Sequence, residues 1–299
     1  MLPTHLKLRA SLLLLACLTP VLSLAQLATQ TPAVSQTAAP AKSSDNDQAN
    51  PLPLWEIGAF GIAVSQQAYP GSSERVNRGL ALPVFVYRGE YLRADRGGAG
   101  LRAIKTPTFE VDIGFAGAFG SRSDSSEARR GMPELGTLVQ FGPRLKWNLG
   151  KGPGNGLLRA ELPLRGVFDI SDQFAQKGAA LEPELIFERQ AKAGWNYSTS
   201  IGVVLGDQKL NQTFYGVAPL NATALRPAYT ATGGLTTWRL AASMSHALTN
   251  DLRIFGFTRL DNVSGSANAS SPLIKSKNGV SFGLGVIYSW KQSERMAAN

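Results

Sequence analysis

The stretch AYPGSSE, residues 68–74, holds residue types that could do chemistry: two hydroxyls and an acid beside a Pro-Gly corner. It could present an exposed nucleophile, bind an anion with its backbone amides, or only turn the chain. An anion loop needs a helix after it to direct amides at the ligand, and the sequence predicts none here. Pro70 and Gly71 suit a tight turn in which Gly71 takes a positive φ. The stretch is therefore predicted to be a turn at the start of a long loop, 66–79.

A serine–histidine pair is the second candidate. The chain has two histidines, His5 and His246, and Ser243 and Ser245 lie next to the latter. In such a pair the histidine accepts the proton of the serine hydroxyl. In the alternating segment 237–248, however, His246 falls with the apolar side chains and both serines fall with the polar ones. We predict that His246 lies at the lipid interface and that the chain has no catalytic residue.

The other chemical patterns are weaker. The stretch GKGPGNG, residues 150–156, lacks the Gly-Lys-Ser/Thr of a phosphate loop and is predicted to be a turn. Glu182, Glu184 and Glu188 share the polar side of one predicted strand, which explains them without acid–base catalysis. No group of His, Cys, Asp and Glu has the spacing of a metal site. The sequence therefore predicts neither an enzyme nor a bound metal or cofactor.

The N-terminal residues are predicted to lie outside the fold. Basic residues, a short apolar run and small residues up to Ala25 are typical of a cleaved secretory signal peptide over residues 1–25. A loose lipobox before Cys17 makes lipidation at that residue the alternative. Residues 26–53 are rich in Ala, Gln, Thr, Ser and Pro, which predicts a disordered periplasmic linker. The mature chain then has no cysteine and no disulfide framework.

From residue 54 to residue 290 the sequence alternates between apolar and polar residues, which predicts strands with one apolar face. In 280–290, for example, apolar and aromatic residues alternate with Ser and Gly: Val280, Phe282, Leu284, Val286, Tyr288 and Trp290 with Ser281, Gly283, Gly285 and Ser289. We predict twelve strands. Ten strands is the alternative, because the alternation that predicts strands 90–96 and 101–106 is weak. The predicted strands are 54–65, 80–88, 90–96, 101–106, 108–120, 134–149, 157–170, 180–190, 194–206, 235–247, 251–262 and 279–290.

The lengths and connections of these strands predict an all-β, transmembrane antiparallel β-barrel. Most predicted strands have ~10–14 residues, and a tilted strand needs about 9–11 to cross a membrane. Long and short connections alternate, as they do between the outer and periplasmic ends of such barrels. Aromatic residues near strand ends fit a girdle at the lipid boundary: Trp147, Trp195, Tyr197, Trp238, Tyr288 and Trp290. We therefore predict a protein of the Gram-negative outer membrane, in contact with its lipid.

Charged residues of both signs occupy the polar sides of the strands and are predicted to point into the lumen. Arg159, Glu161 and Arg165, for example, follow one another on one strand. They could line a path for solutes, or pair with one another and fix the register of a plugged interior, which we favour. The net charge of +9 comes from scattered basic residues, so no nucleic-acid surface is predicted.

Prolines inside the predicted strands conflict with a simple barrel. Four prolines fall inside predicted strands, although a closed barrel has no free edge to accommodate them, so bulges or shorter strands are expected at Pro83, Pro143, Pro163 and Pro183.

The last strand carries Gly285, Tyr288 and Trp290 in the spacing Gly-x-x-aromatic-x-aromatic. This spacing resembles the C-terminal signal read by barrel-assembly machinery, but a tail, residues 291–299, follows it.

Several motifs occur in a fixed order: AYPGSSE before LPVFVYRGEYLRAD, RRGMPELG running into FGPRLKW, then FYGV and SPLI. Across residues 54–290 this order resembles the MltA-interacting protein/OmpV (MipA/OmpV) family of outer-membrane proteins. The motif residues, of unassigned role, are Tyr69, Pro70, Gly71, Ser72, Arg88, Gly89, Gly131, Met132, Pro133, Tyr215, Gly216, Ser271 and Pro272.

The resemblance implies an outer-membrane β-barrel. It also implies a non-enzymatic scaffold that bridges a periplasmic murein hydrolase and a murein synthase, which is the leading hypothesis. A solute channel or a surface adhesin or receptor is the alternative, and a soluble periplasmic β-protein is the third. The predicted topology places the motifs beside the outward loops, away from periplasmic partners. Either these loops fold into the lumen, or the motif residues serve another role.

Overall fold

The computed structural model describes residues 53–88, 92–95, 98–106, 108–118, 120–121, 126–191 and 194–295. The predicted signal peptide, the predicted linker up to residue 52, the motif residue Gly89 and tail residues 296–299 lie outside these ranges. Among the described residues, no helix is both long and apolar enough to cross a membrane.

The described residues form one antiparallel sheet of thirteen strands that closes into a barrel. Neighbouring strands follow the chain order, and β13 pairs back with β1. The segments β8 and β9 lie end to end, since both pair with β7 on one side and β10 on the other. The strands are β1 (Trp55–Gln67), β2 (Arg75–Arg88), β3 (Leu92–Asp95), β4 (Gly98–Lys105), β5 (Phe109–Ala118), β6 (Leu138–Lys151), β7 (Leu157–Asp169), β8 (Ala175–Leu181), β9 (Glu184–Arg189), β10 (Trp195–Gly206), β11 (Gly234–Ala247), β12 (Leu252–Asn262) and β13 (Asn278–Gln292).

The predicted all-β barrel is confirmed, with two local corrections. The predicted strand 180–190 is split at Pro183 into β8 and β9, which accounts for the difference between twelve predicted strands and thirteen observed ones. The predicted long loop 66–79 is wrong, because β2 begins at Arg75 and leaves a connection of residues 68–74. Regular pairing with β1 extends β2 through Asn77 and Arg78, polar residues that the pattern had assigned to a loop.

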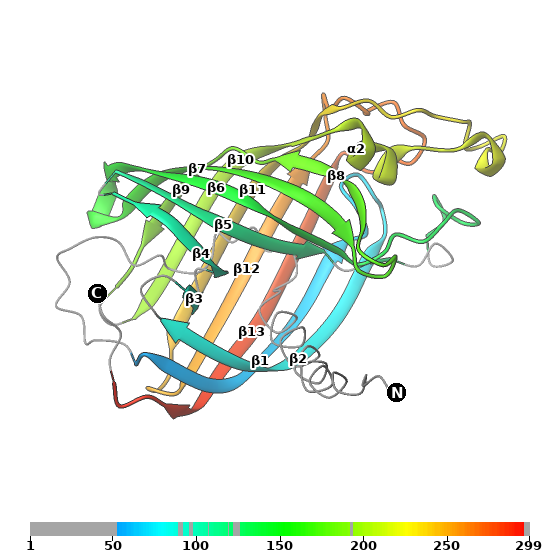
Figure 1. Cartoon of the computed structure of the whole chain (residues 1–299). Helices are drawn as coiled ribbons and strands as arrows, with labels where there is room; N and C mark the ends of the chain where they lie inside the picture. Colours follow the sequence, from blue (N-terminus) through cyan, green and yellow to red (C-terminus); the bar gives the residue numbers. More distant parts are fainter. Residues whose placement is uncertain are drawn as a thin grey trace, which may run out of the picture.

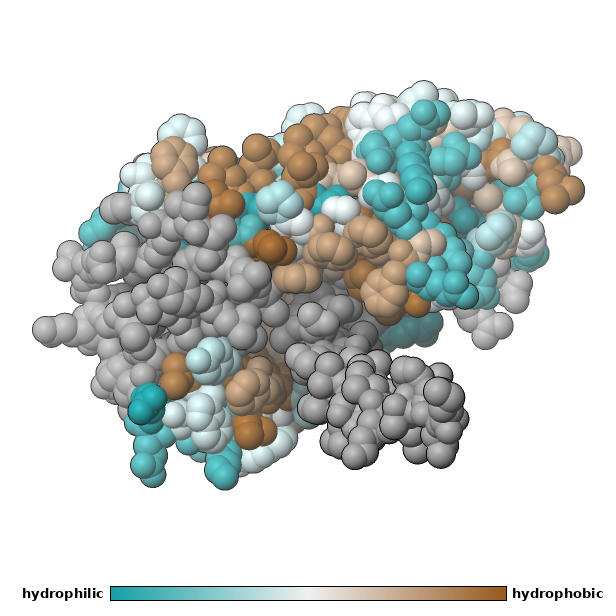
Figure 2. Space-filling view, in the orientation of Figure 1, coloured by the Kyte–Doolittle hydropathy of each residue, from teal (hydrophilic) through white to brown (hydrophobic). Residues whose placement is uncertain are grey.

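The outer face of the barrel is apolar over most strands. Alternate residues of β6, β10, β11 and β13 are exposed there, as a lipid-facing wall requires. Figure 2 shows apolar residues gathered over the side of the barrel and hydrophilic ones over the end with the long loops. The exposed outer-face residues include Leu145, Trp147, Ile201, Leu240, Met244, Phe282, Leu284 and Val286.

The two ends of the barrel differ. The connections 68–74, 207–233 and 263–277 lie at one end, which we call the loop end, together with helix α2 (Gln208–Tyr215) (Figure 1). The start of β1 and the finish of β13 lie at the opposite end, the turn end, where the amide of Leu54 donates to the carbonyl oxygen of Arg295 over 2.7 Å. At the turn end, Trp147 stacks on Phe109 with ring centroids 5.4 Å apart, as in an aromatic girdle.

The strand prolines are accommodated in three ways. Pro183 separates β8 from β9. Pro143 lies where the β6–β7 ladder is interrupted, between the pairs Phe141–Gly166 and Arg144–Pro163. Pro83 lies in β2, which pairs with β1 along its length but with β3 at Tyr87 and Arg88. Within the part of the chain that the structure describes, Pro83 thus lies on a stretch of β2 with one ladder partner, where proline is tolerated.

Candidate functional site: the loop cap and the lumen

Four connections pack together over the loop end and form a structure that we call the loop cap: residues 68–74, 126–137, 207–233 and 263–277. Each connection contributes to one buried apolar core, and Tyr215 and Leu273 in that core are fully buried. Tyr69 and Tyr215 meet edge to face, with ring centroids 6.4 Å apart. The core members are Tyr69, Ala128, Met132, Leu135, Tyr215, Val217, Ala231 and Leu273.

Side-chain hydrogen bonds to backbone join the connections to one another. The hydroxyl of Tyr69 donates to the carbonyl oxygen of Leu273 over 2.8 Å. The hydroxyl of Tyr215 donates to the carbonyl oxygen of Pro70 over 3.0 Å, and Ser271 Oγ donates to the carbonyl oxygen of Tyr215 over 2.8 Å. The bonds of Tyr69 and Ser271 are buried and satisfy acceptors that water cannot reach, and the bond of Tyr215 is part-buried.

The stretch AYPGSSE is a tight turn, as predicted. The amide of Ser72 donates to the carbonyl oxygen of Tyr69 over 3.0 Å, and Gly71 has φ of 92°. The carbonyl oxygen of Gly71 then accepts from the amides of Lys275 and Ser276 at 2.8 and 3.0 Å. The turn is thus an element of the loop cap, held in place by hydrogen bonds from the 263–277 connection.

A buried arginine supports the cap from within. Arg129 is 4% exposed and donates to the carbonyl oxygens of Phe214 and Pro133, each over 3.2 Å. Its guanidinium lies 5.8 Å from the centre of the Tyr69 ring, in cation–π range. Burial lowers the pKa of Arg129 from its ordinary value, and burial raises the pKa of Tyr69 to about 12 and that of Tyr215 further. Both tyrosines therefore stay neutral donors at physiological pH.

Helix α2 ties the cap to the inside of the barrel wall. The carboxylate of Asp207 caps the helix by accepting from the amide of Leu210 over 2.8 Å. Leu210 is buried with Leu138, Val167, Ala180 and Val204, which lie on β6, β7, β8 and β10. Leu138 and Val167 share the inward parity of the charged lumen residues Arg144 and Arg165 on β6 and β7. The loops therefore fold over and into the mouth of the barrel.

A family model described as MltA-interacting protein MipA matches residues 57–290. The chain belongs to this family. Among solved structures, a NanC porin matches with 9% identity and a TM-score of 0.34, over 79% of this chain and 98% of that one. OprB of Pseudomonas putida matches with 7% identity and a TM-score of 0.36, over 79% and 94% of the two chains. An outer membrane channel from Pseudomonas putida F1 matches with 10% identity and a TM-score of 0.35, over 83% and 100%. No curated protein matches the chain.

The motif residues of this MipA-family chain that the structure describes converge, except for Arg88, on the loop cap. Tyr69, Met132 and Tyr215 supply core side chains, and Ser271 supplies a hydrogen bond. Arg88 ends β2 at the turn end and is separate from the cap. The other motif residues of the cap lie beside these in the same connections: Pro70, Gly71, Ser72, Gly131, Pro133, Gly216 and Pro272.

Sequence reasoning missed three buried polar residues of the cap. Arg129 lies inside the RRGMPELG motif but was not distinguished from its neighbours. Asn268 is fully buried and both accepts from the amide of Thr232 and donates to its carbonyl oxygen, each over 2.9 Å. Asn211 is also fully buried and accepts from the hydroxyl of Thr236 over 2.8 Å. An asparagine in a polar loop gives no sequence signal of burial, because composition there indicates exposure.

Ion pairs line the lumen side of several strands of the MipA-family barrel, from β5 to β12. On β6, Arg144 Nη2 lies 2.6 Å from Asp112 Oδ2 on β5, and its Nη1 lies 3.4 Å from Glu161 Oε2 on β7. The series continues across further strands through the pairs Lys146–Asp112, Arg159–Glu161, Arg159–Glu188, Arg165–Glu182, Arg239–Asp261 and Arg259–Asp261. Pairs between neighbouring strands specify the register, which agrees with the interpretation favoured from the sequence.

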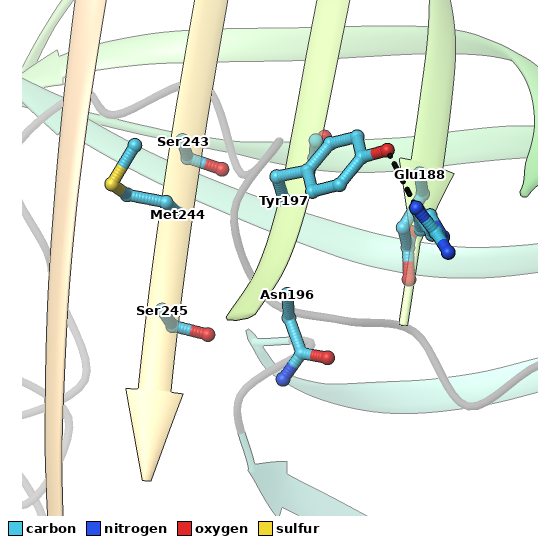
Figure 3. Close-up of a pocket in the computed structure, with 8 residues that line it drawn as sticks. Glu188, Asn196, Tyr197, Ser243, Met244 and Ser245 are labelled. Atoms are coloured by element: carbon cyan, nitrogen blue, oxygen red, sulfur yellow. Dashed lines mark hydrogen bonds between the residues drawn. The ribbon is translucent and has the colours of Figure 1, made fainter. Parts of the chain in front are cut away.

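The serine–histidine candidates are separated by the wall. Figure 3 shows Ser243 and Ser245 on one side of β11 and Met244 on the other. His246 has the parity of Met244, and its ring stacks on outward-facing Trp195 at 5.0 Å. The small cavity at the serines, lined also by Glu188, Asn196 and Tyr197, has a volume of about 10 Å³, enough for a single water. His246 therefore lies at the outer interface, as predicted, and cannot accept a proton from either serine.

The remaining predicted features have clear positions. Tyr288 and Trp290 of the candidate assembly signal are exposed on the outer face at the turn end, and Gly285 faces the lumen. Among the described residues, no group of three His, Cys, Asp or Glu side chains could hold a metal ion.

Proposed function

We propose that this protein is a non-enzymatic outer-membrane barrel that anchors murein-remodelling enzymes on its periplasmic side. The proposal is supported by one structural observation above others: the loop cap closes the mouth with its own buried core and is bonded into the wall through α2. A barrel closed in this way serves better as an anchor than as a pore. The family name, MltA-interacting protein, indicates the class of partner.

The anchoring surface in this proposal is the turn end. Outer-membrane barrels place their short turns and both chain ends in the periplasm. The turn between β6 and β7 presents Asn155, which is exposed and has φ of 60°. The loop cap lies at the opposite end, so its motif residues act on closure of the barrel and not on the murein partner.

Site-specific photo-crosslinking tests this assignment. A photoreactive amino acid at Asn155, on the turn end, should capture a murein hydrolase or synthase in intact cells. The matched position is Leu220, on the loop cap, which is 96% exposed and should capture neither enzyme. Capture of murein enzymes from Leu220 alone, or from neither position, would overturn the proposal.

A surface receptor or adhesin is the second candidate, and one observation favours it. Leu220 and Leu225 are 96% and 91% exposed at the tip of the loop cap. Arg226 holds this tip by donating to the carbonyl oxygens of Ala128 and Arg130, each over 3.0 Å. Two exposed leucines on a fixed tip suit contact with a partner outside the cell. Loss of cell adhesion in Leu220→Ser/Leu225→Ser, with murein crosslinks retained, would favour this role.

A solute channel is the remaining alternative, and conductance decides it. The purified barrel in a planar bilayer should show no steady current, because the cap and the ion pairs occupy the path. Single-channel steps of uniform size in the full-length protein would contradict the closed state.

A further inference from the structure

Among the described residues, the barrel ladder is interrupted beside β2. The β2–β3 ladder joins Tyr87 to Ala94 and Arg88 to Arg93, at the turn end. Within the described residues, the β2 edge from Arg75 to Val86 therefore has a ladder partner on the β1 side alone. Pro83, which has no amide to donate to a ladder, lies on the same stretch of β2. Since the mouth is closed by the loop cap, this edge offers a sideways route between the membrane and the lumen.

The inner wall next to this edge is apolar. Leu80 and Leu82 of β2 pair with Ile62 and Phe60 of β1, so all four side chains lie on the same face. That face is the inner one, because Phe60 stacks on Phe255 at 5.7 Å and the Phe255 ring fills the space over lumen-facing Gly285. The apolar lining continues along β12, β13, β1 and β2 through Phe255, Phe257, Ile62, Val64, Val84 and Val86.

The wall across the lumen from this lining is ionic. Its first pair along β5 and β6 is Asp112–Arg144, on the far side of the short β3–β4 hairpin, and the β4–β5 ladder there ends at Asp112. The lumen side of β2 is therefore apolar, and the far rim of the break begins at the charged pair Asp112–Arg144. A lumen with one apolar wall and one ionic wall matches a molecule that has an apolar chain and a charged head.

Arg78 gives the sign of that charge. It lies on β2 opposite Val64, on the lumen side, and it is exposed. Arg78 has no ion-pair partner among the described residues, whereas the arginines of the ionic wall are neutralised by carboxylates. A free guanidinium beside an apolar lining favours an anionic head group.

We propose that the lumen binds an anionic amphiphile with a long apolar chain, which enters from the bilayer past the β2 edge. The chain lies against Leu80, Leu82 and Phe60, and the anionic head contacts Arg78. This site is independent of the turn-end surface, so its function does not depend on a murein partner.

Binding of palmitate to the delipidated full-length protein in nonionic detergent tests the site. We expect one saturable palmitate per barrel. Leu82→Asn, which makes the lining polar, should weaken binding at least about tenfold. Ala81→Asn is the matched control, because Ala81 is the neighbouring residue on the outer face, and it should bind as the unaltered protein does. Arg78→Gln should weaken binding of palmitate, and hexadecanol should bind weakly to every variant.

Equal binding by Leu82→Asn and the unaltered protein would overturn the site, and equal binding of hexadecanol would overturn the anionic head group. A labelling experiment covers the case in which Leu82→Asn fails to fold. In a Cys17→Ala background reconstituted in vesicles, a bilayer-soluble maleimide should label Leu82→Cys. Ser200→Cys, at a buried lumen position of the closed wall, should stay unlabelled. Failure to label Leu82→Cys in the folded protein would exclude the sideways route.

Discussion

The hydroxyl of Tyr215 donates to the carbonyl oxygen of Pro70, which lies 145 residues earlier in the chain. The hydroxyl of Tyr69, next to Pro70, donates in turn to Leu273, 204 residues away. Two adjacent residues of one tight turn are thereby bonded to two different connections. The loop cap is consequently one cooperative unit, in which loosening any connection exposes the core shared by the others.

Tyr215→Phe tests that cooperativity. The change keeps the ring but removes the hydrogen bond to the part-buried Pro70 carbonyl, which costs about 0.5–1.5 kcal/mol. We expect protease cleavage within 207–233 and within 263–277 to increase together. The control is Tyr288→Phe, since Tyr288 is exposed on the outer face and should change neither rate. Faster cleavage of one connection alone would show that the connections open independently.

The loop cap should be sensitive to alkali. Burial raises the pKa of Tyr69 from 10.0 to about 12, so the folded cap retains a proton that the unfolded chain has lost. Stability is therefore complete below pH 10 and falls as pH rises from 10 towards 12. Protease resistance of the cap measured across this range should fall in step, and Tyr69→Phe should flatten the dependence. Resistance that decreases with falling pH would have the wrong sign for this cause.

Asp261 should be indispensable to the ionic wall. It lies 2.8 Å from Arg239 Nε and 2.9 Å from Arg259 Nε, and its side chain is 3% exposed. Asp261→Leu removes the acid common to two buried cations, which costs roughly 3–5 kcal/mol of unfolding free energy. Urea unfolding followed by heat-modifiable gel migration measures the loss.

The matched control for Asp261 is Asp172→Asn. Asp172 pairs with Lys177 over 2.7 Å, but its side chain is 61% exposed. Solvent screens such a pair, so the change should cost less than about 1 kcal/mol. Similar losses for the two variants would show that burial adds nothing to the ionic wall.

The sequence predicted the barrel because its outer face alternates with period two on most strands. That signal is strongest where small or polar residues face inward, as on β13, where Val280, Phe282 and Leu284 alternate with Ser281 and Gly283. It is weaker on β2 and on the first half of β12, where Leu80, Leu82, Phe255 and Phe257 also face inward, so the two-sided lining of the lumen could not be inferred. When both faces of a strand are apolar, the sequence does not show which face points into the lumen.

The loop cap could be recognised from the sequence only as separate motifs. Tyr69, Met132, Tyr215 and Leu273 meet through contacts across more than a hundred residues, and no local pattern encodes such contacts. The tight turn at Pro70 and Gly71 was predictable, because its φ requirement is local. Its bonding to Lys275 was not, because that depends on how β1 and β13 are paired.

Substitutions at Gly285 can show whether this glycine is needed for packing in the lumen or as part of the signal read by the assembly machinery. A Cβ there would overlap the Phe255 ring and come within 2.6 Å of the carbonyl oxygen of Gly61, so Gly285→Ala should reduce the yield of folded barrel. Gly79→Ala, at open space, should not. If packing is the cause, adding Phe255→Ala to Gly285→Ala should restore part of the yield, because the ring that the new Cβ would overlap is then absent. A residue read by the assembly machinery would show no such rescue, and heat-modifiable migration of the four proteins distinguishes the two roles.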